Sequence, residues 1–312
     1  MRSYARLLPL VAASLFLGGC LYVDDWAGSD AYHEDFHSTH ALSAGGRVSV
    51  ESFNGSIEVL GWEQDSVEVS GTKNASSRDA LNSIRIDVDS TPGVVRIRAD
   101  RPSGPHWQSG VRFAIRVPHK AMLDSIATSN GRIQVEDVEG TARLHTSNGA
   151  IRMSRLKGEL EARTSNGAIE ADDLKGNVNL HTSNGQIRAE ASGGVFEAAT
   201  SNGGIDARLS DSKGAWPVRL ETSNGRIELT LDSKQLPDVR ASTRNSSIEL
   251  RLPVGASARV RASTSHAPIT VEFDELRSEG RREHPQLEGT IGAGGPLLDL
   301  ESSNGPIRIR KL

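Results

Sequence analysis

The sequence predicts an all-β fold, a single-stranded parallel β-helix (β-solenoid) with coils of about 18 residues. The first observation is a tetrapeptide, Thr-Ser-Asn-Gly, that recurs at a fixed period. The second is an alternation of apolar and polar residues around each copy. The third is a composition of 36% hydrophobic but only 4% aromatic residues, with 31 glycines. Such a composition suits a narrow aliphatic core that is repeated along an axis.

The tetrapeptide sets the period of the repeat. Four successive spacings are 18 residues and the fifth is 22, and the copies begin at Thr128, Thr146, Thr164, Thr182, Thr200 and Thr222. Degenerate copies begin at Ser52, Thr243, Thr264 and Ser302. Repetition at a fixed period of this size indicates a solenoid or another array.

The residues around each copy alternate with period two, which is typical of strands and not of helices. An isoleucine stands five residues after the start of every full copy, at Ile133, Ile151, Ile169, Ile187, Ile205 and Ile227. A second turn is supplied by a glycine about six residues before four of the copies, at Gly140, Gly158, Gly176 and Gly194. Each coil is therefore predicted as strand, Asn-Gly corner, strand and Gly corner. A meander of hairpins is the alternative, because Asn-Gly also favours hairpin turns. Parallel stacking is favoured because near-identical strands recur once per period.

The parity of the strand predicts where the side chains of the tetrapeptide point. Its threonine shares a side with the apolar residues two and four positions earlier, so it should point inward, with serine outward and asparagine in the corner. We expect the asparagines to form an amide ladder and the glycine to supply a positive φ. The predicted structural ladder consists of Thr128, Asn130, Thr146, Asn148, Thr164, Asn166, Thr182, Asn184, Thr200, Asn202, Thr222 and Asn224. The functional alternative is an exposed threonine array that binds ice or a regular polymer, and it would need outward threonines.

Residues 1–19 have the features of a lipoprotein signal peptide. Basic residues precede an apolar run from Leu7 to Leu17, which is too short to span a bilayer. The sequence Leu-Gly-Gly-Cys, ending at Cys20, resembles the lipobox of bacterial lipoproteins, which implies cleavage before Cys20 and lipid attachment to it. Leucine rather than aspartate at position 21 favours the outer membrane, by the sorting pattern of Gram-negative lipoproteins. We therefore expect a cell-envelope protein whose lipid anchor binds the membrane.

The rest of the chain divides by its periodicity. Residues 20–44, beginning with the lipidated cysteine, are polar and aperiodic, so we expect a flexible tether there. The β-solenoid should cover residues 45–312. Within it, we expect divergent coils over 45–125, regular coils over 126–273, and an insertion followed by C-terminal coils over 274–312. The insertion is charged, and loops on a rigid scaffold often carry function, so it is a candidate partner-binding segment.

Metal, cofactor and nucleic-acid binding are not predicted. The candidate metal ligands are His33, His37 and His40, but their polar, aperiodic surroundings favour a solvated tether. The formal net charge is −4 and no basic tract stands out, so we expect no nucleic-acid partner. We expect no cofactor. The chain has one cysteine, which excludes an intramolecular disulfide.

Catalysis would need two carboxylates, or a carboxylate and a base, on one face of the solenoid, as in polysaccharide-active β-helix enzymes. The carboxylates that could share a face are Glu136, Asp137, Asp172 and Asp173. They belong to coils two repeats apart, and no cleft-forming loop surrounds them. We therefore expect a protein that is not an enzyme.

The sequence resembles a family of bacterial β-strand-repeat proteins of unknown function that are often described as adhesins. The likeness rests on Gly-Arg-Val-Ser-Val-Glu-Ser-Phe-Asn-Gly-Ser-Ile-Glu-Val (46–59), Gly-Trp-Glu-Gln-Asp-Ser-Val-Glu-Val (61–69), Val117-Pro118 and the Thr-Ser-Asn-Gly series. It covers about residues 45–312. The resemblance implies a single-stranded β-helix and carries over no catalytic residue.

The resemblance and the lipobox together favour a non-enzymatic cell-envelope lipoprotein, an adhesin-like or scaffolding module. The alternative is an envelope-stress accessory protein that binds a regulator or a cell-wall polymer. In either case the expected partner is an envelope protein or a cell-wall polymer. A polysaccharide-active enzyme is the third possibility.

Overall fold

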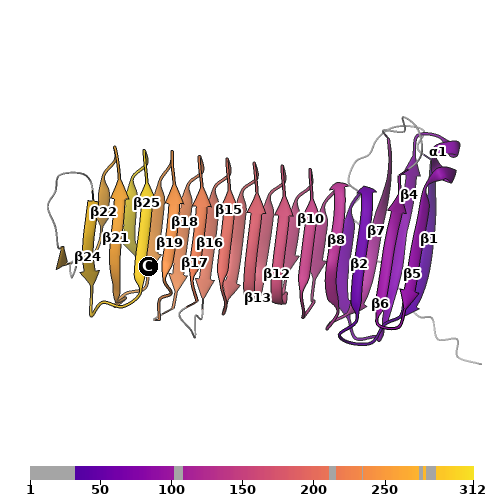
Figure 1. Ribbon diagram of the computed structural model, residues 1–312, viewed down its shortest axis with the longest axis horizontal. Coiled ribbons are helices and arrows are strands. Elements are labelled where there is room, and N and C mark those ends of the chain that lie inside the picture. Colours follow the sequence, from indigo (N-terminus) through magenta and orange to yellow (C-terminus); the bar gives the residue numbers. More distant parts are fainter. Residues whose placement is uncertain (1–31, 102–107, 211–215, 234, 274–276, 279–285) are drawn as a thin grey trace, which may run out of the picture. The chain divides into compact units, whose positions relative to one another are not determined.

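The computed structural model describes residues 32–312, apart from 102–107, 211–215, 234, 274–276 and 279–285 (Figure 1). The predicted signal peptide and Cys20 lie outside the described residues. Within the described part, no helix is long and apolar enough to cross a membrane.

Most of the described chain is a stack of coils, and each coil contributes one strand to each of two parallel-stranded faces (Figure 1). The strands that lead into the Asn-Gly corner form the first face: β2 (Arg47–Asn54), β8 (Met122–Asn130), β10 (Ala142–Thr146), β12 (Lys157–Thr164), β15 (Phe196–Thr200), β17 (Val218–Thr222), β19 (Val239–Thr243), β21 (Ala258–Thr264) and β25 (Leu297–Ser302).

The strands that leave this corner form the second face: β3 (Ile57–Trp62), β9 (Ile133–Glu136), β11 (Ile151–Ser154), β14 (Ile187–Ser192), β16 (Ile205–Ser210), β18 (Ile227–Asp232), β20 (Ile248–Leu252), β22 (Ile269–Val271) and β26 (Ile307–Lys311). Strand β13 (Ile169–Thr182) belongs to both faces. Its first residues pair with β11 and β14, and its last with β12 and β15. The expected all-β parallel solenoid is confirmed.

Identical residues of successive coils stack on one another in the core. Ile151 lies in register between Ile133 and Ile169, and all three side chains are fully buried. The same register places Thr146 over Thr128 on one side and Thr164 on the other. Burying one such isoleucine contributes about 1.5–3 kcal/mol. The repeated aliphatic column is therefore the main source of stability of the stack.

The order of the coils in space differs from their order in the sequence at both ends. Strand β25 pairs with β19 on one side and with β21 on the other, and β26 lies between β20 and β22. The last coil of the chain is thus inserted between two earlier coils. At the other end, β2 lies between β8 and β6 (Val94–Asp100), and β3 lies between β9 and β7 (Ser109–Pro118).

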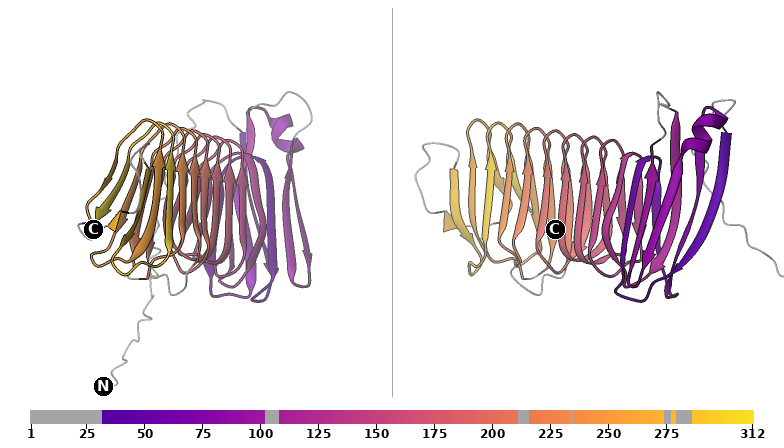
Figure 2. Two further views of the ribbon diagram at one scale, coloured as in Figure 1. Left: turned by 60° about the vertical axis from the view of Figure 1, so that its left-hand side comes forward. Right: turned by 45° about the vertical axis from the view of Figure 1, so that its right-hand side comes forward.

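Antiparallel strands cap both ends of the stack. At the N-terminal end, β4 (Ser66–Ala75) pairs with β7, and β5 (Arg85–Thr91) pairs with β6. The short helix α1 (Arg78–Ser83) begins after its N-cap Ser77 and lies at this end (Figure 2). At the C-terminal end, β24 (Gln286–Ile291) pairs with β21, and β23 (Arg277–Ser278) pairs with β24. These caps cover strand edges that would otherwise present unpaired backbone groups.

The flexible tether expected over residues 20–44 is wrong for its second half. Residues 32–41 form strand β1 (Tyr32–Ala41), which pairs antiparallel with β4 along its whole length. Phe36 anchors the strand, because its ring packs edge-on against Phe113 with the centroids 5.6 Å apart. Lys73 adds an ion pair to Glu34 at 2.8 Å. The sequence hides this strand because its side chains are mostly polar.

Candidate binding surfaces

The threonines of the repeat point into the stack and are only 0–5% exposed. Each of the six hydroxyls donates a hydrogen bond to a glycine carbonyl of the adjacent coil at 2.9–3.1 Å. The Thr164 hydroxyl, for example, donates to Gly149 O and accepts from Gly167 N–H at 3.2 Å. These hydroxyls close the corner and join neighbouring coils. They are therefore not available to an external ligand such as ice.

The glycine of the tetrapeptide is required for space and not for its backbone conformation. None of the six glycines in the full copies has a positive φ, so the expected positive φ is wrong. A Cβ at Gly167 would lie 1.7 Å from the carbonyl oxygen of Gly149 in the preceding coil. The other five corner glycines are equally crowded, at 1.7–1.9 Å. Positive φ is found instead at the second corner, for example at Gly158 with φ +138°.

The asparagines of the repeat form one continuous row on the exposed edge of the corner. Each Nδ2 donates to the Oδ1 of the neighbouring coil at 2.6–2.8 Å, along Asn304, Asn245, Asn224, Asn202, Asn184, Asn166, Asn148, Asn130 and Asn54. Asn54 ends the row by donating to the Ser109 carbonyl at 3.1 Å. The corner is thus held by a buried hydroxyl row and an exposed amide row. Both connect coils to one another.

A polar hollow of about 230 Å³ opens on the outer side of the first face. Its floor is Ala199 on β15, and its rim includes His181 on β13 and Glu221 on β17. Asn179, Glu197, Arg163 and Arg219 also line it. The register places His181 and Glu221 on the two strands that flank Ala199.

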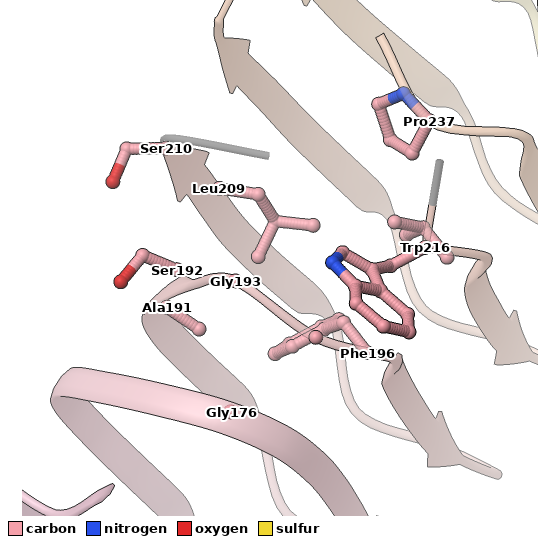
Figure 3. Close-up of a pocket in the computed structure, with 11 residues that line it drawn as sticks. Gly176, Ala191, Ser192, Gly193, Phe196, Leu209, Ser210, Trp216 and Pro237 are labelled. Carbon is pink, nitrogen blue, oxygen red and sulfur yellow. The ribbon is translucent and has the colours of Figure 1, made fainter. Parts of the chain in front are cut away.

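A second, apolar hollow lies at the Gly corner of a central coil (Figure 3). Trp216 is 46% exposed, and its indole lies beside Phe196, with Leu209 and Pro237 nearby. The enclosed space is only about 20 Å³, which is enough for a single water molecule. The indole therefore largely fills this hollow itself.

The family model for Toastrack DUF4097 matches residues 47–310. The chain belongs to the Toastrack DUF4097 family. This agrees with the resemblance to β-strand-repeat proteins of unknown function. No curated protein matches the chain.

Solved structures similar to this Toastrack chain are described as binding or adhesion proteins. A putative adhesin from Parabacteroides merdae is 9% identical, with a TM-score of 0.41, and the match covers 91% of this chain and 97% of that one. A putative adhesin from Bacteroides fragilis is 9% identical, with a TM-score of 0.39 and coverages of 91% and 98%. A putative lipid binding protein from Parabacteroides distasonis is 11% identical, with a TM-score of 0.29 and coverages of 91% and 97%. At TM-scores below 0.5, these likenesses do not inform function.

Three of the four carboxylates considered for catalysis, Glu136, Asp137 and Asp173, are bound in ion pairs on the Toastrack stack, and Asp172 is exposed. Arg155 contacts Asp137 at 2.7 Å and Glu136 at 2.9 Å. The hydrogen bond from Arg155 lowers the pKa of Asp137 below its usual value, which makes Asp137 a poor proton donor. Asp173, two coils from Asp137, pairs with Lys175 at 3.2 Å. These contacts suit a surface ladder of alternating charge better than a pair of catalytic acids.

The histidines considered as metal ligands do not converge. His33 and His37 lie on one side of β1, and His40 lies on the other, since side chains alternate along a strand. The His40 ring is hydrogen-bonded to Ser38 at 3.0 Å. Over the described part of the chain, no group of three or more His, Cys, Asp or Glu side chains could hold a metal ion. Of the charged insertion after residue 273, residues 274–276 and 279–285 lie outside the described residues, whereas 277–278 and 286–291 form the capping strands β23 and β24.

Proposed function

We propose that this Toastrack protein is a non-enzymatic binding module of the bacterial cell envelope, adhesin-like or scaffolding, that a lipid on Cys20 holds in the outer membrane. The observation that carries the proposal is the polar outer side of the first face. It presents rows of exposed polar side chains in fixed register, and one hollow interrupts it. Its histidine, arginine, asparagine and glutamate side chains can exchange hydrogen bonds with a partner.

The stack is well suited to present such a surface. Each coil that carries the full tetrapeptide is joined to its neighbours by backbone ladders, by a threonine hydroxyl and by an asparagine amide, so the outer side chains keep fixed spacings. Adjacent strands lie about 4.8 Å apart, and the outer side chains repeat at that interval. A repetitive partner, such as a cell-wall polymer, can meet several coils at once and gain from multivalency.

An envelope-stress accessory protein that binds a protein regulator is the second candidate. It is favoured by the N-terminal cap, where β1 and α1 depart from the repeat. Arg78 stacks on the ring of Tyr32, which is 43% exposed, so this cap has an exposed aromatic and cationic surface. Aromatic and arginine side chains are enriched in protein interfaces.

Co-sedimentation tests the proposal. The full chain, purified from membranes in mild detergent, should bind isolated cell-wall sacculi or outer-membrane fragments saturably. If the chain binds no envelope fraction saturably, the proposed function is contradicted. Cross-linking in cells to one protein partner, lost on replacing Arg78 with alanine, would favour the second candidate. Release of soluble sugar from the sacculi would contradict the non-enzymatic assignment.

A further inference from the structure

One row of outward side chains crosses the first face next to the buried threonines. It consists of His145, Arg163, His181, Ala199 and Glu221, one residue on each of β10, β12, β13, β15 and β17. The four long side chains are exposed. Ala199 stands between two of them and contributes only a methyl group. The polar hollow forms because the short side chain of Ala199 lies between longer side chains on the two neighbouring strands.

The two walls of the hollow are His181 and Glu221. They lie two strand spacings apart, about 10 Å from backbone to backbone. In the part of the chain that the structure describes, neither side chain forms a hydrogen bond or an ion pair. An imidazole and a carboxylate thus face each other across a gap, each with its hydrogen-bonding capacity free for a ligand.

The other polar groups of the hollow are already paired. Arg163 donates to Glu161 at 2.6 Å. Asn179 donates to Glu197 at 3.1 Å, and Arg219 lies 4.0 Å from the same carboxylate. The two arginines are therefore balanced by acids. This balance disfavours a polyanion such as nucleic acid, and the lack of an aromatic lining residue disfavours a flat apolar ligand.

We propose that the hollow over Ala199 binds one uncharged sugar unit of a polysaccharide. The inference rests on the proposed function and names its site and its ligand class. Sugar hydroxyls both donate and accept hydrogen bonds, which matches a rim made of imidazole, carboxylate and amide groups. At about 230 Å³ the hollow is smaller than the roughly 300–1,000 Å³ of sites that enclose whole small molecules. It therefore suits a single unit, whose neighbours in the polymer would lie along the polar row.

Titration of uncharged oligosaccharides into the full chain in mild detergent tests this site. The probes are chitotetraose, cellotetraose and maltotetraose, and heats of binding give the affinity. Ala199→Arg fills the hollow and should weaken binding of the recognised probe at least about tenfold, the equivalent of 1.4 kcal/mol. Glu221→Gln keeps the shape of the wall and should weaken binding by about three- to tenfold.

The matched control is Ala127→Arg. Ala127 lies in the same row, on β8 beside His145, and it does not line the hollow. It should leave the affinity unchanged, and both arginine variants should keep the wild-type melting curve because arginine already occupies this row at Arg163. An Ala199→Arg variant that folds and binds as tightly as wild type would refute the site.

The remaining outcomes separate the site from the broader function. If none of the three oligosaccharides binds, or if polygalacturonate binds and they do not, the uncharged-sugar assignment is wrong. Saturable binding to sacculi that persists unchanged in Ala199→Arg would leave the proposed function standing and reject the hollow. Loss of sacculus binding in Ala199→Arg, with retention in Ala127→Arg, would support both.

Discussion

Thr164→Val tests the corner on which the whole stack depends. Valine keeps the shape of the side chain and removes its hydroxyl. In the structure that hydroxyl donates to Gly149 O at 2.9 Å and accepts from Gly167 N–H at 3.2 Å. A buried polar group left without a partner costs about 1–3 kcal/mol. Because Gly167 is only partly buried, we expect the two losses together to lower the free energy of unfolding by about 2–4 kcal/mol.

Thr164→Ser is the matched control, because serine keeps the hydroxyl and loses one methyl group. Its cost should be about 1 kcal/mol, close to the value of one buried CH₂. Urea unfolding followed by far-UV circular dichroism measures both variants against the wild type. The stability of a solenoid is approximately the sum of the stabilities of its coils and of the interfaces between neighbouring coils. The weakened interface should therefore shift the first unfolding transition to a lower urea concentration. A valine variant as stable as the serine variant would refute the role assigned to the hydroxyl.

Three further changes probe other parts of the chain. Asn166→Ala removes two hydrogen bonds of the amide row and should lower the free energy of unfolding in urea by about 1–3 kcal/mol. Ser165→Ala should change it by no more than about 0.5 kcal/mol. Equal costs would contradict the assigned directions of the two side chains. Gly167→Ala would place a Cβ 1.7 Å from the Gly149 carbonyl oxygen. It should therefore cost about 3 kcal/mol or more, and a wild-type melting temperature would show that the corner can widen. Cys20→Ala should abolish lipid labelling and release the chain from membranes, and unchanged retention in detergent partitioning would argue against the anchor.

The repeat by itself determines the regular part of this protein. A period of 18 residues, an isoleucine at one fixed position and alternating polarity specify coils in which identical residues stack in parallel. The parity of each strand also places the threonine among the apolar residues, and Thr164 is indeed buried. These features are readable because they are local and recur in every coil. The same local pattern places Asn166 at the corner, where its amide meets those of both neighbouring coils.

Only the tertiary structure decided the order of the coils at the ends, the strand at 32–41 and the reason for the corner glycine. Parallel pairing joins segments that are far apart in the sequence. Because the coils have similar sequences, each coil could stack on several others equally well. The sequence therefore does not reveal that the last coil inserts between two earlier ones. Position 167 requires glycine because a carbonyl oxygen of the preceding coil leaves no room for a Cβ, and not because of its own φ. The hollow over Ala199 likewise exists only because stacking sets a short side chain between His181 and Glu221.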